Sequence, residues 1–273
     1  MNNILCIKRP PHFDLDKIFD CGQSFRFEKG ADNVWEGVAY GRVLRISQDK
    51  ENVYLNRSKE EFDGIWREYL GLDLDYDEVN ADIMKHFEPG VMEAAIAAGD
   101  GIRILKQEPW ETLCSFIISQ NNNIPRIKAL ISAVCRSYGE KFEYDGKEYY
   151  AFPTPEALLA AGEEGLKALK TGFRAGYLIS AAEHCAGGMD LYKIRDEYTY
   201  EQGMEELCTI KGVGPKVASC TLLFALDKKS AFPVDVWIKK TIDKYFGGHL
   251  DVSSLGEYAG IAQQYLFYYE RSL

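Results

Sequence analysis

The chain has 273 residues, of which 46% are hydrophobic and 27% are charged, and its formal net charge at pH 7 is −10. These values are typical of a globular protein with a large core and room for two domains, and they exclude a low-complexity chain. No run of about 18 apolar residues occurs, so we expect no membrane span. Seven cysteines, none of them in a CxxC pair, favour reduced thiols inside a cell, and the first residues lack the features of a secretion signal.

The first hundred residues predict an antiparallel β-sheet domain. Three short segments are rich in aromatic and β-branched residues: 35–39, 42–47 and 52–55. Tyr40 and Gly41 suit a turn between the first two of them. Apolar residues then recur at helical spacing over residues 62–69, which predicts a helix covering one face of the sheet. We interpret the acidic stretch 73–78 as a solvated connection.

From residue 101 onward the pattern predicts helices almost throughout. Helices are expected after Pro109, over residues 127–138, after Thr154, from near Ala175, as a pair within residues 200–226, over residues 235–246 and over residues 255–269. We therefore predict an α+β fold with two parts. Residues 1–100 form an antiparallel β domain with covering helices, and residues 101–273 form a mostly helical region.

The negative charge is concentrated in one part of the chain. Residues 51–100 contain 13 acidic and 4 basic residues, a balance of −9. Residues 207–246 contain seven lysines and three aspartates, a balance of +4. The overall charge argues against a nucleic-acid partner, but the second segment could provide a basic surface locally. Alternatively, about half of these lysines lie on ordinary solvated helix faces.

The most informative segment is a helix–hairpin–helix pattern at residues 207–218. Gly212 and Gly214 flank Val213 and suit a tight turn, because glycine permits positive φ and close backbone approach. Pro215 then fits the first turn of a new helix. The unpaired N–H groups at the start of that helix could hold a phosphate without reading a base sequence.

Two residues beside the hairpin could carry chemistry. Lys216 lies in the first turn of the second helix, where the helix N-terminus disfavours positive charge and so favours a neutral, nucleophilic amine. Asp235 ends a Pro-Val-Asp turn and can cap the following helix, which would hold its carboxylate rigid and ionised. Taken singly, the first would be a surface lysine and the second a plain helix cap.

The hairpin and the Pro-Val-Asp turn together resemble the helix-hairpin-helix (HhH-GPD) superfamily of DNA base-excision glycosylases. Four further segments resemble the 8-oxoguanine DNA glycosylases within it: Cys21-Gly-Gln-Ser-Phe-Arg26, Ser119-Gln-Asn-Asn-Asn-Ile-Pro-Arg126, Gly172-Phe-Arg-Ala175 and Ala262-Gln-Gln-Tyr-Leu-Phe267. They occur in order, so the resemblance covers nearly the whole chain. It implies a twisted antiparallel β domain followed by two helical subdomains, with the DNA cleft between them.

The resemblance assigns the catalytic roles to Lys216, as nucleophile at the anomeric carbon, and to Asp235. It implies a pocket for the extruded base formed by Gly22, Cys220, Gln263 and Phe267. A thiolate at Cys220 would pair with the Lys216 ammonium, although free cysteine is more often a small buried hydrophobic residue. Gly22 would accept the N7 hydrogen that 8-oxoguanine has and guanine lacks. Without the resemblance, we would interpret Phe267 as an ordinary residue of the hydrophobic core.

The same resemblance places Asn121, Arg126 and Arg174 against the orphaned partner base, with Phe173 as a stacking wedge. Arginines that donate to cytosine would explain a preference for cytosine opposite the lesion. As an alternative, the run of asparagines at residues 121–123 is a plain helix C-cap.

Two positions depart from the family pattern. Trp237 stands where the family usually has a histidine that contacts a phosphate, and Glu270 stands where an aspartate pairs with that histidine. We expect DNA phosphate contacts at Gly212, Gly214 and, through the indole N–H, Trp237.

The resemblance also bears on metals and cofactors. The hairpin carbonyl groups of Cys208, Ile210 and Val213 could hold a structural Na⁺ or K⁺. No cysteine follows Cys220, so we expect neither an iron–sulfur cluster nor any required cofactor.

The sequence thus predicts a bifunctional 8-oxoguanine DNA glycosylase and AP lyase, a monomer acting on double-stranded DNA that contains 8-oxoguanine. It would work in the cytoplasm of a bacterium or the nucleus of a eukaryote. One alternative is a monofunctional alkylpurine DNA glycosylase, which would keep Asp235 but not need Lys216. The other is a non-enzymatic helix-hairpin-helix DNA-binding module.

Overall fold

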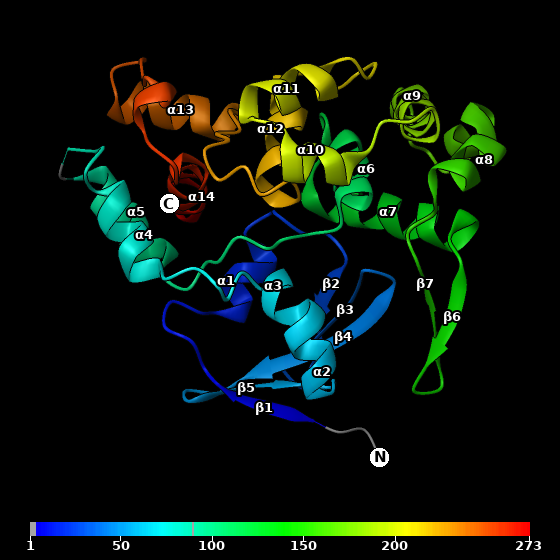
Figure 1. The fold of residues 1–273 in the computed structure, drawn as a ribbon, viewed down its shortest axis with the longest axis horizontal. Coiled ribbons are helices and arrows are strands. Elements are labelled where there is room, and N and C mark those ends of the chain that lie inside the picture. The colour runs from blue at the N-terminus through cyan, green and yellow to red at the C-terminus, as the bar shows by residue number, and fades with distance from the viewer. Residues whose placement is uncertain (1–3, 89) are drawn as a thin grey trace.

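A computed structural model describes residues 4–88 and 90–273, and it contains a five-stranded sheet below a larger helical body (Figure 1). Every pair of neighbouring strands is antiparallel, in the order β1-β5-β4-β3-β2. The strands are β1 (Leu5–Lys8), β2 (Phe27–Lys29), β3 (Trp35–Ala39), β4 (Arg42–Gln48) and β5 (Asn52–Leu55). The expected run β3-β4-β5 is confirmed, whereas β1 and β2 lacked a signal strong enough to predict them.

The turn between β3 and β4 explains their tight pairing. Tyr40 and Gly41 both have positive φ, 52° and 66°, which is the backbone of a two-residue hairpin turn that matches the strand twist. One face of the sheet forms its own core with α1 (Leu15–Asp20) and a helix formed by α2 (Lys59–Glu61), a π-helical segment (Phe62–Trp66) and α3 (Arg67–Tyr69). The predicted covering helix is therefore confirmed.

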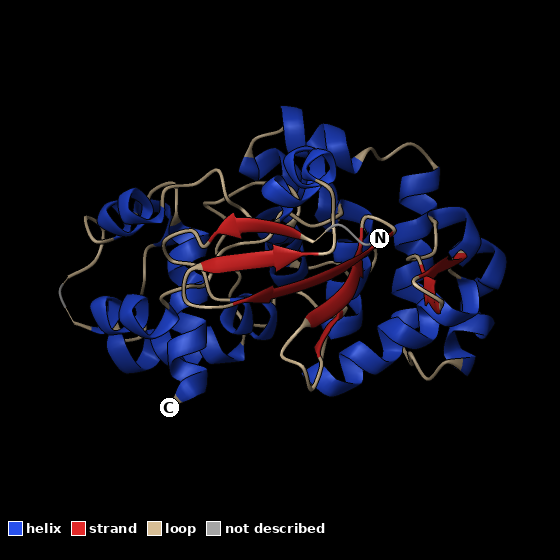
Figure 2. Cartoon of the chain, turned by 90° about the horizontal axis from the view of Figure 1, so that it is seen from below, coloured by secondary structure: helices blue, strands red, loops and turns tan. Residues whose placement is uncertain are grey.

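The helical body is built around a second core. Its helices are α4 (Tyr76–Ile83), α5 (Val91–Gly99), α6 (Pro109–Ser119), α7 (Ile124–Tyr138), α8 (Pro155–Ala168), α9 (Arg174–Ala186), α10 (Leu191–Glu197), α11 (Tyr200–Cys208), α12 (Pro215–Phe224), α13 (Val236–Tyr245) and α14 (Ala259–Ser272). Thr154 caps α8 and Gly139 ends α7, as predicted. Seen from below, the sheet crosses the middle of the molecule with helices at both ends (Figure 2). Among the described residues, no helix has the length and apolar character that crossing a membrane requires.

The predicted division at residue 100 does not coincide with the boundary between the two cores. Helices α4 and α5 contribute to the helical core and not to the core of the sheet. Gly99 lies directly against the ring of Tyr265 on α14, and the Tyr265 hydroxyl is 3.0 Å from Asn80 Oδ1. The acidic stretch was also wrong as a connection, because the Asp75 carboxylate caps α4 and the following acidic residues form its first turn.

A hairpin of β6 (Lys141–Tyr144) and β7 (Lys147–Tyr150) interrupts the helical region and was not predicted. It extends down beside the sheet in Figure 1. The Tyr149 hydroxyl donates to Glu36 Oε1 at 2.8 Å, and Asn56 Nδ2 donates to the Tyr144 hydroxyl at 2.8 Å. The hairpin therefore connects the helical body to β3 and to the end of β5, the two strands that lie next to the edge strands of the sheet.

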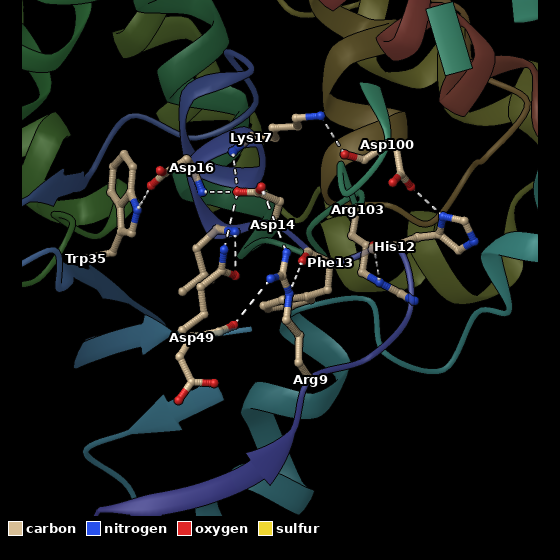
Figure 3. A network of polar contacts seen from close by, with 12 residues as sticks. Arg9, His12, Phe13, Asp14, Asp16, Lys17, Trp35, Asp49, Asp100 and Arg103 are labelled. Carbon is tan, nitrogen blue, oxygen red and sulfur yellow. Dashed lines mark hydrogen bonds and ion pairs between the residues drawn. The ribbon is translucent and has the colours of Figure 1, made fainter. Parts of the chain in front are cut away.

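A polar network joins the segment before α1 to the loops around α4 and α5 (Figure 3). The buried Arg103 guanidinium donates to four backbone carbonyl groups: Pro11, His12, Gly71 and Leu74. Lys17 Nζ donates to the carbonyls of Ala98 and Asp100, at 2.8 and 2.7 Å, where α5 ends. These charge-assisted bonds replace the backbone partners that three irregular segments lack.

His12 adds a titratable link to this network. Its Nδ1 is 2.5 Å from Asp100 Oδ1 and its Nε2 is 2.9 Å from Asp77 Oδ1. Burial opposes the charged ring, but the hydrogen bonds and charges of the two aspartates outweigh it, so the pKa of His12 is raised above 6.5. The charged form of His12 therefore joins the N-terminal segment to the first turn of α4 and to the end of α5.

The free energy of unfolding should consequently depend on pH through His12. Because the pKa of His12 is higher in the folded protein, this contribution is complete below about pH 6.5 and disappears as pH rises through the raised pKa. Urea unfolding at several pH values should show the decline for the wild-type protein, and His12→Gln should make it shallower. An identical pH profile in the two proteins would contradict the assignment.

Candidate active site

The hairpin of residues 207–218 forms as predicted, between α11 and α12. Gly212 has φ +85° and lies under the ring of Tyr177 on α9, so a side chain there would overlap the ring. Gly214 differs from the expectation of positive φ, because it is extended, with φ −102°. Nothing lies within 4 Å of a side-chain carbon built on Gly214, so the surface beside it at the start of α12 is open.

Lys216 points from the first turn of α12 toward the end of α6. Its Nζ is 3.4 Å from Ser119 Oγ and 5.1 Å from the ring centroid of Phe116. The Ser119 hydroxyl donates to the Phe116 carbonyl, so it is left with lone pairs to accept from Lys216. Lys216 is therefore half-buried, and its amine is loosely held between α12 and α6.

Cys220 lies one turn after Lys216 and is 3% exposed. Burial raises the pKa of its thiol, the Lys216 ammonium lowers it and the Asp235 carboxylate raises it again. The structure thus brings these three predicted residues into one neighbourhood. The expected thiolate is not favoured, because the net direction keeps the thiol protonated.

Asp235 caps α13, as the sequence predicted. Its carboxylate accepts the Ile238 backbone N–H at 2.9 Å. The cap fixes the side chain at the helix start and leaves carboxylate lone pairs for other partners.

Gly22 reaches the site from the opposite end of the chain. It has φ +84°, and a side-chain carbon built on it would lie 3.6 Å from the Phe267 ring. Gln264 Nε2 on α14 donates to the Cys21 carbonyl at 2.7 Å. Gln23 Nε2 bonds the carbonyls of Ile18 and Arg103, both at 2.9 Å. These buried amides fix the Gly22 turn against α14.

Gln263 and Phe267 share one face of α14, as expected from their spacing. Gln263 is 4% exposed, and its Oε1 has no hydrogen-bond partner among the residues described. A buried amide oxygen without a donor is rare and costly in a folded protein. Phe267 is only half-buried beside it. An accessible ring therefore lies next to Gly22, with an unpaired amide oxygen one turn earlier on the same face of α14.

The three asparagines after α6 have different roles. Asn122 Nδ2 donates to the Ile118 carbonyl at 3.1 Å, and the Asn123 side chain caps α7 by accepting the Arg126 N–H at 3.0 Å. Asn121 is exposed, has φ +50° and makes no side-chain hydrogen bond within the described part of the chain. The predicted C-terminal capping thus holds for Asn122 alone, because Asn123 caps the start of α7, and the Asn121 side chain remains available for other partners.

Arg174 is buried, and its guanidinium already binds backbone. Nε donates to the Gln120 carbonyl at 2.9 Å, Nη2 to the Asn121 carbonyl at 3.1 Å and Nη1 to the Thr171 carbonyl at 3.2 Å. The structure therefore gives Arg174 a positioning role for the turn that carries Asn121. This differs from the expected direct contact with a base.

Phe173 and Arg126 lie exposed on either side of Arg174. Phe173 is 50% exposed, and its ring packs against the Arg174 guanidinium at 4.5 Å and edge-on to Tyr177 at 5.6 Å. Burial and the nearby charge of Arg126 both lower the pKa of Arg174. These side chains form one rim with Asn121.

The two departures from the family pattern lie apart from each other. Trp237 is 41% exposed, with Lys240 Nζ 4.9 Å from its ring centroid. Glu270 pairs with Lys244 at 3.2 Å. The Glu270 carboxylate of α14 therefore pairs with a lysine that lies two turns after Trp237 on α13.

The site also contains three polar residues for which the sequence predicted no role. They are Ser119, Gln23 and Gln264, and each lies within one of the segments that resemble the 8-oxoguanine DNA glycosylases. Their function comes from contacts between residues far apart in sequence, such as Ser119 and Lys216, which are 97 positions apart. Spacing in sequence carries no signal for such contacts.

Comparison with known proteins agrees with this geometry. Residues 6–113 match the family "8-oxoguanine DNA glycosylase, N-terminal domain", and residues 114–253 match "HhH-GPD superfamily base excision DNA repair protein". The N-glycosylase/DNA lyase of Saccharomyces cerevisiae is 33% identical over 83% of this chain and 66% of its own length, just under two thirds. N-glycosylase/DNA lyase OGG1 of Arabidopsis thaliana is 30% identical over 93% of this chain and 76% of that protein.

A solved structure extends the similarity to three dimensions. The apo crystal structure of the Clostridium acetobutylicum 8-oxoguanine glycosylase/lyase is 38% identical, covers 98% of this chain and 97% of that chain, and has a TM-score of 0.91. The chain belongs to the HhH-GPD superfamily of base excision DNA repair proteins and, within it, to the 8-oxoguanine DNA glycosylases.

The two hairpin glycines provide a matched test of the geometry. Gly212→Ala should lower the free energy of unfolding by about 2–4 kcal/mol, because it combines positive-φ strain with overlap of the Tyr177 ring. Gly214→Ala should change it by less than about 0.5 kcal/mol, since its backbone is extended and its surroundings are open. Urea unfolding of both variants measures the difference. Equal destabilisation by the two would contradict this description of the turn.

Proposed function

We propose that this protein is a bifunctional 8-oxoguanine DNA glycosylase and AP lyase, with Lys216 as its nucleophile. The observation that carries the assignment is the shared neighbourhood of Lys216, Cys220 and Asp235 at the start of α12. A hairpin that only binds DNA would need the glycines and the helix start. It would not need a half-buried amine in the same neighbourhood as a carboxylate that caps a helix.

The chemistry follows from these positions. The neutral amine of Lys216 attacks C1′ of the extruded nucleotide, and the bond from C1′ to the base nitrogen breaks with its electron pair on the base. The ionised Asp235 offsets the positive charge that develops on the sugar. The amine, now bonded to C1′, opens the sugar to a Schiff base. Loss of a C2′ proton then expels the 3′ phosphate by β-elimination, which is the lyase step.

The base pocket is proposed to lie between Phe267 and Cys220. Phe267 offers a ring for stacking, and the protonated thiol of Cys220 offers a small polarisable surface. The unpaired Oε1 of Gln263 can accept a hydrogen from an amino or imino group of a purine. The Gly22 carbonyl would accept the N7 hydrogen of 8-oxoguanine, and it would meet only a lone pair on guanine.

The rim residues are proposed to fill the space that the base leaves. Phe173 would stack as a wedge, and Asn121 and Arg126 would reach the orphaned partner base. Arg174 would act through the turn that it holds. A guanidinium that donates to the O2 and N3 acceptors of cytosine supports a preference for cytosine opposite the lesion.

Phosphate binding and the hairpin cation complete the proposal. The N-terminus of α12, with its open surface at Gly214, and the exposed Lys240, stacked on Trp237, suit a phosphate backbone. We also infer a structural Na⁺ or K⁺ at the carbonyls of Cys208, Ile210 and Val213. The Ile210 carbonyl accepts the Val213 N–H at 3.0 Å, and its second lone pair remains for a cation. We further propose that the protein acts as a monomer, without a required cofactor, in the compartment that holds the DNA.

The nucleophile can be tested with Lys216→Gln. This variant should lower the rate of 8-oxoguanine excision by about 10⁴-fold or more and abolish borohydride trapping, while still binding the lesion duplex. The exposed Lys193→Gln serves as a control and should keep both activities. Trapping retained by Lys216→Gln would refute its role, and excision without any trapping in the wild type would favour a monofunctional glycosylase.

Asp235 allows its two roles to be separated. Asp235→Asn keeps an acceptor for the Ile238 N–H, so thermal stability should not change, but excision should slow by about 10²-fold because the negative charge is lost. Asp235→Ala should lose the same activity and in addition about 1 kcal/mol of stability. Single-turnover excision and thermal unfolding measure the two effects. An Asp235→Asn variant of full activity would leave only the capping role.

A further inference from the structure

Three residues on α14 form a row at intervals of one turn: Gln263, Phe267 and Arg271. Gln263 is 4% exposed, Phe267 is half-buried and the Arg271 side chain is 29% exposed. The row therefore runs from the interior to the surface, and Arg271 stands at the outer end of the proposed base pocket.

Arg271 carries a donor without an acceptor. Its Nη2 is 3.5 Å from Asp20 Oδ2, at the limit of a hydrogen bond. Its Nη1 is shielded from solvent and has no hydrogen-bond partner among the described residues. A buried N–H without an acceptor is uncommon in a folded protein, so an atom from outside the chain would complete it.

The free donor faces Gly22. A side-chain carbon built on Gly22 would lie 3.8 Å from Arg271 Nη1 and 3.6 Å from the Phe267 ring. The guanidinium, the ring and the Gly22 backbone thus meet at one point. The charge of Arg271 also reaches Cys21, where it opposes the rise that burial causes in the pKa of the thiol.

We propose that Arg271 is a specificity-determining residue whose Nη1–H donates to the C8 carbonyl oxygen of extruded 8-oxoguanine. This inference rests on the proposed function, in which Gly22 accepts the neighbouring N7 hydrogen. The lesion then presents the N7–H donor beside the C8 carbonyl acceptor, and the protein presents the Gly22 carbonyl acceptor beside the Arg271 Nη1–H donor. Guanine carries a hydrogen at C8 and leaves Arg271 unpaired, which adds a second term to discrimination.

A DNA phosphate is the weaker alternative partner. Phosphates are held by exposed cationic side chains and by helix N-termini. Arg271 Nη1 is instead shielded, near the C-terminal end of α14 and against the main chain of Gly22. A carbonyl group entering with the base can reach such a position with little loss of phosphate solvation.

The test compares two substrates and three variants of the full-length protein. One duplex carries 8-oxoguanine opposite cytosine, and the other carries an abasic site at the same position. Arg271→Met keeps the length of the side chain without its donors, Arg271→Lys keeps the charge without the planar fork, and Asp20→Asn removes the ion pair but leaves Arg271 intact. Single-turnover cleavage and thermal unfolding are measured for each.

Arg271→Met should slow excision of 8-oxoguanine by about 10- to 100-fold while changing cleavage at the abasic site by less than about twofold. Arg271→Lys should fall between it and the wild type, and Asp20→Asn should match the wild type on both substrates. Equal losses on both duplexes would overturn the proposal in favour of a backbone contact. Normal excision by Arg271→Met, or a loss reproduced by Asp20→Asn, would overturn it as well. A wild-type protein without any excision would refute the proposed function itself.

Discussion

Gln264 on α14 donates a hydrogen bond to the carbonyl of Cys21, across 243 positions of the chain. This bond joins the last helix to the turn after α1, and the proposed base pocket depends on it. Gly22 supplies a backbone carbonyl and α14 supplies the residues that face it, so neither half recognises a purine alone. Since both groups of the bond are buried, its loss would leave two unsatisfied polar atoms. The interface between sheet and helices is thereby part of the site.

The acidic composition and a DNA-binding role are compatible because the charges are separated along the chain. The acidic residues of segment 51–100 are largely used within the fold: Asp75 caps α4, and Asp77 and Asp100 hold His12. Three exposed lysines, Lys211 near the hairpin and Lys239 and Lys240 on α13, remain for an external anion. Binding to DNA then relies on a local basic surface and on helix N-termini, and it needs no overall positive charge.

The sequence predicted the helices and the central run of strands correctly, but it carried no signal for the way α4 and α5 pack. Local rules were sufficient for the caps at Thr154 and Asp235 and for the strands around Tyr40, because turn and capping chemistry acts within a few residues. The resemblance supplied the roles of Lys216 and its partners, and the structure brings them together. Helices α4 and α5 pack in the helical core and not in the core of the sheet, and such long-range packing leaves no local pattern in the sequence. The hydrogen bonds of Arg174 to backbone carbonyl groups likewise could not be predicted, because two of them join residues more than 50 positions apart.

Phe173 directly precedes helix α9, and its ring meets the ring of Tyr177 on that helix edge-on at 5.6 Å. The ring of Tyr177 also supports Gly212, so a single rigid element connects the exposed aromatic wedge to the hairpin. A duplex held at the hairpin would meet that wedge at a set separation, without any need to search for it. The start of α9 would thereby fix the distance between the DNA strand bound at the hairpin and the base step that Phe173 is proposed to open.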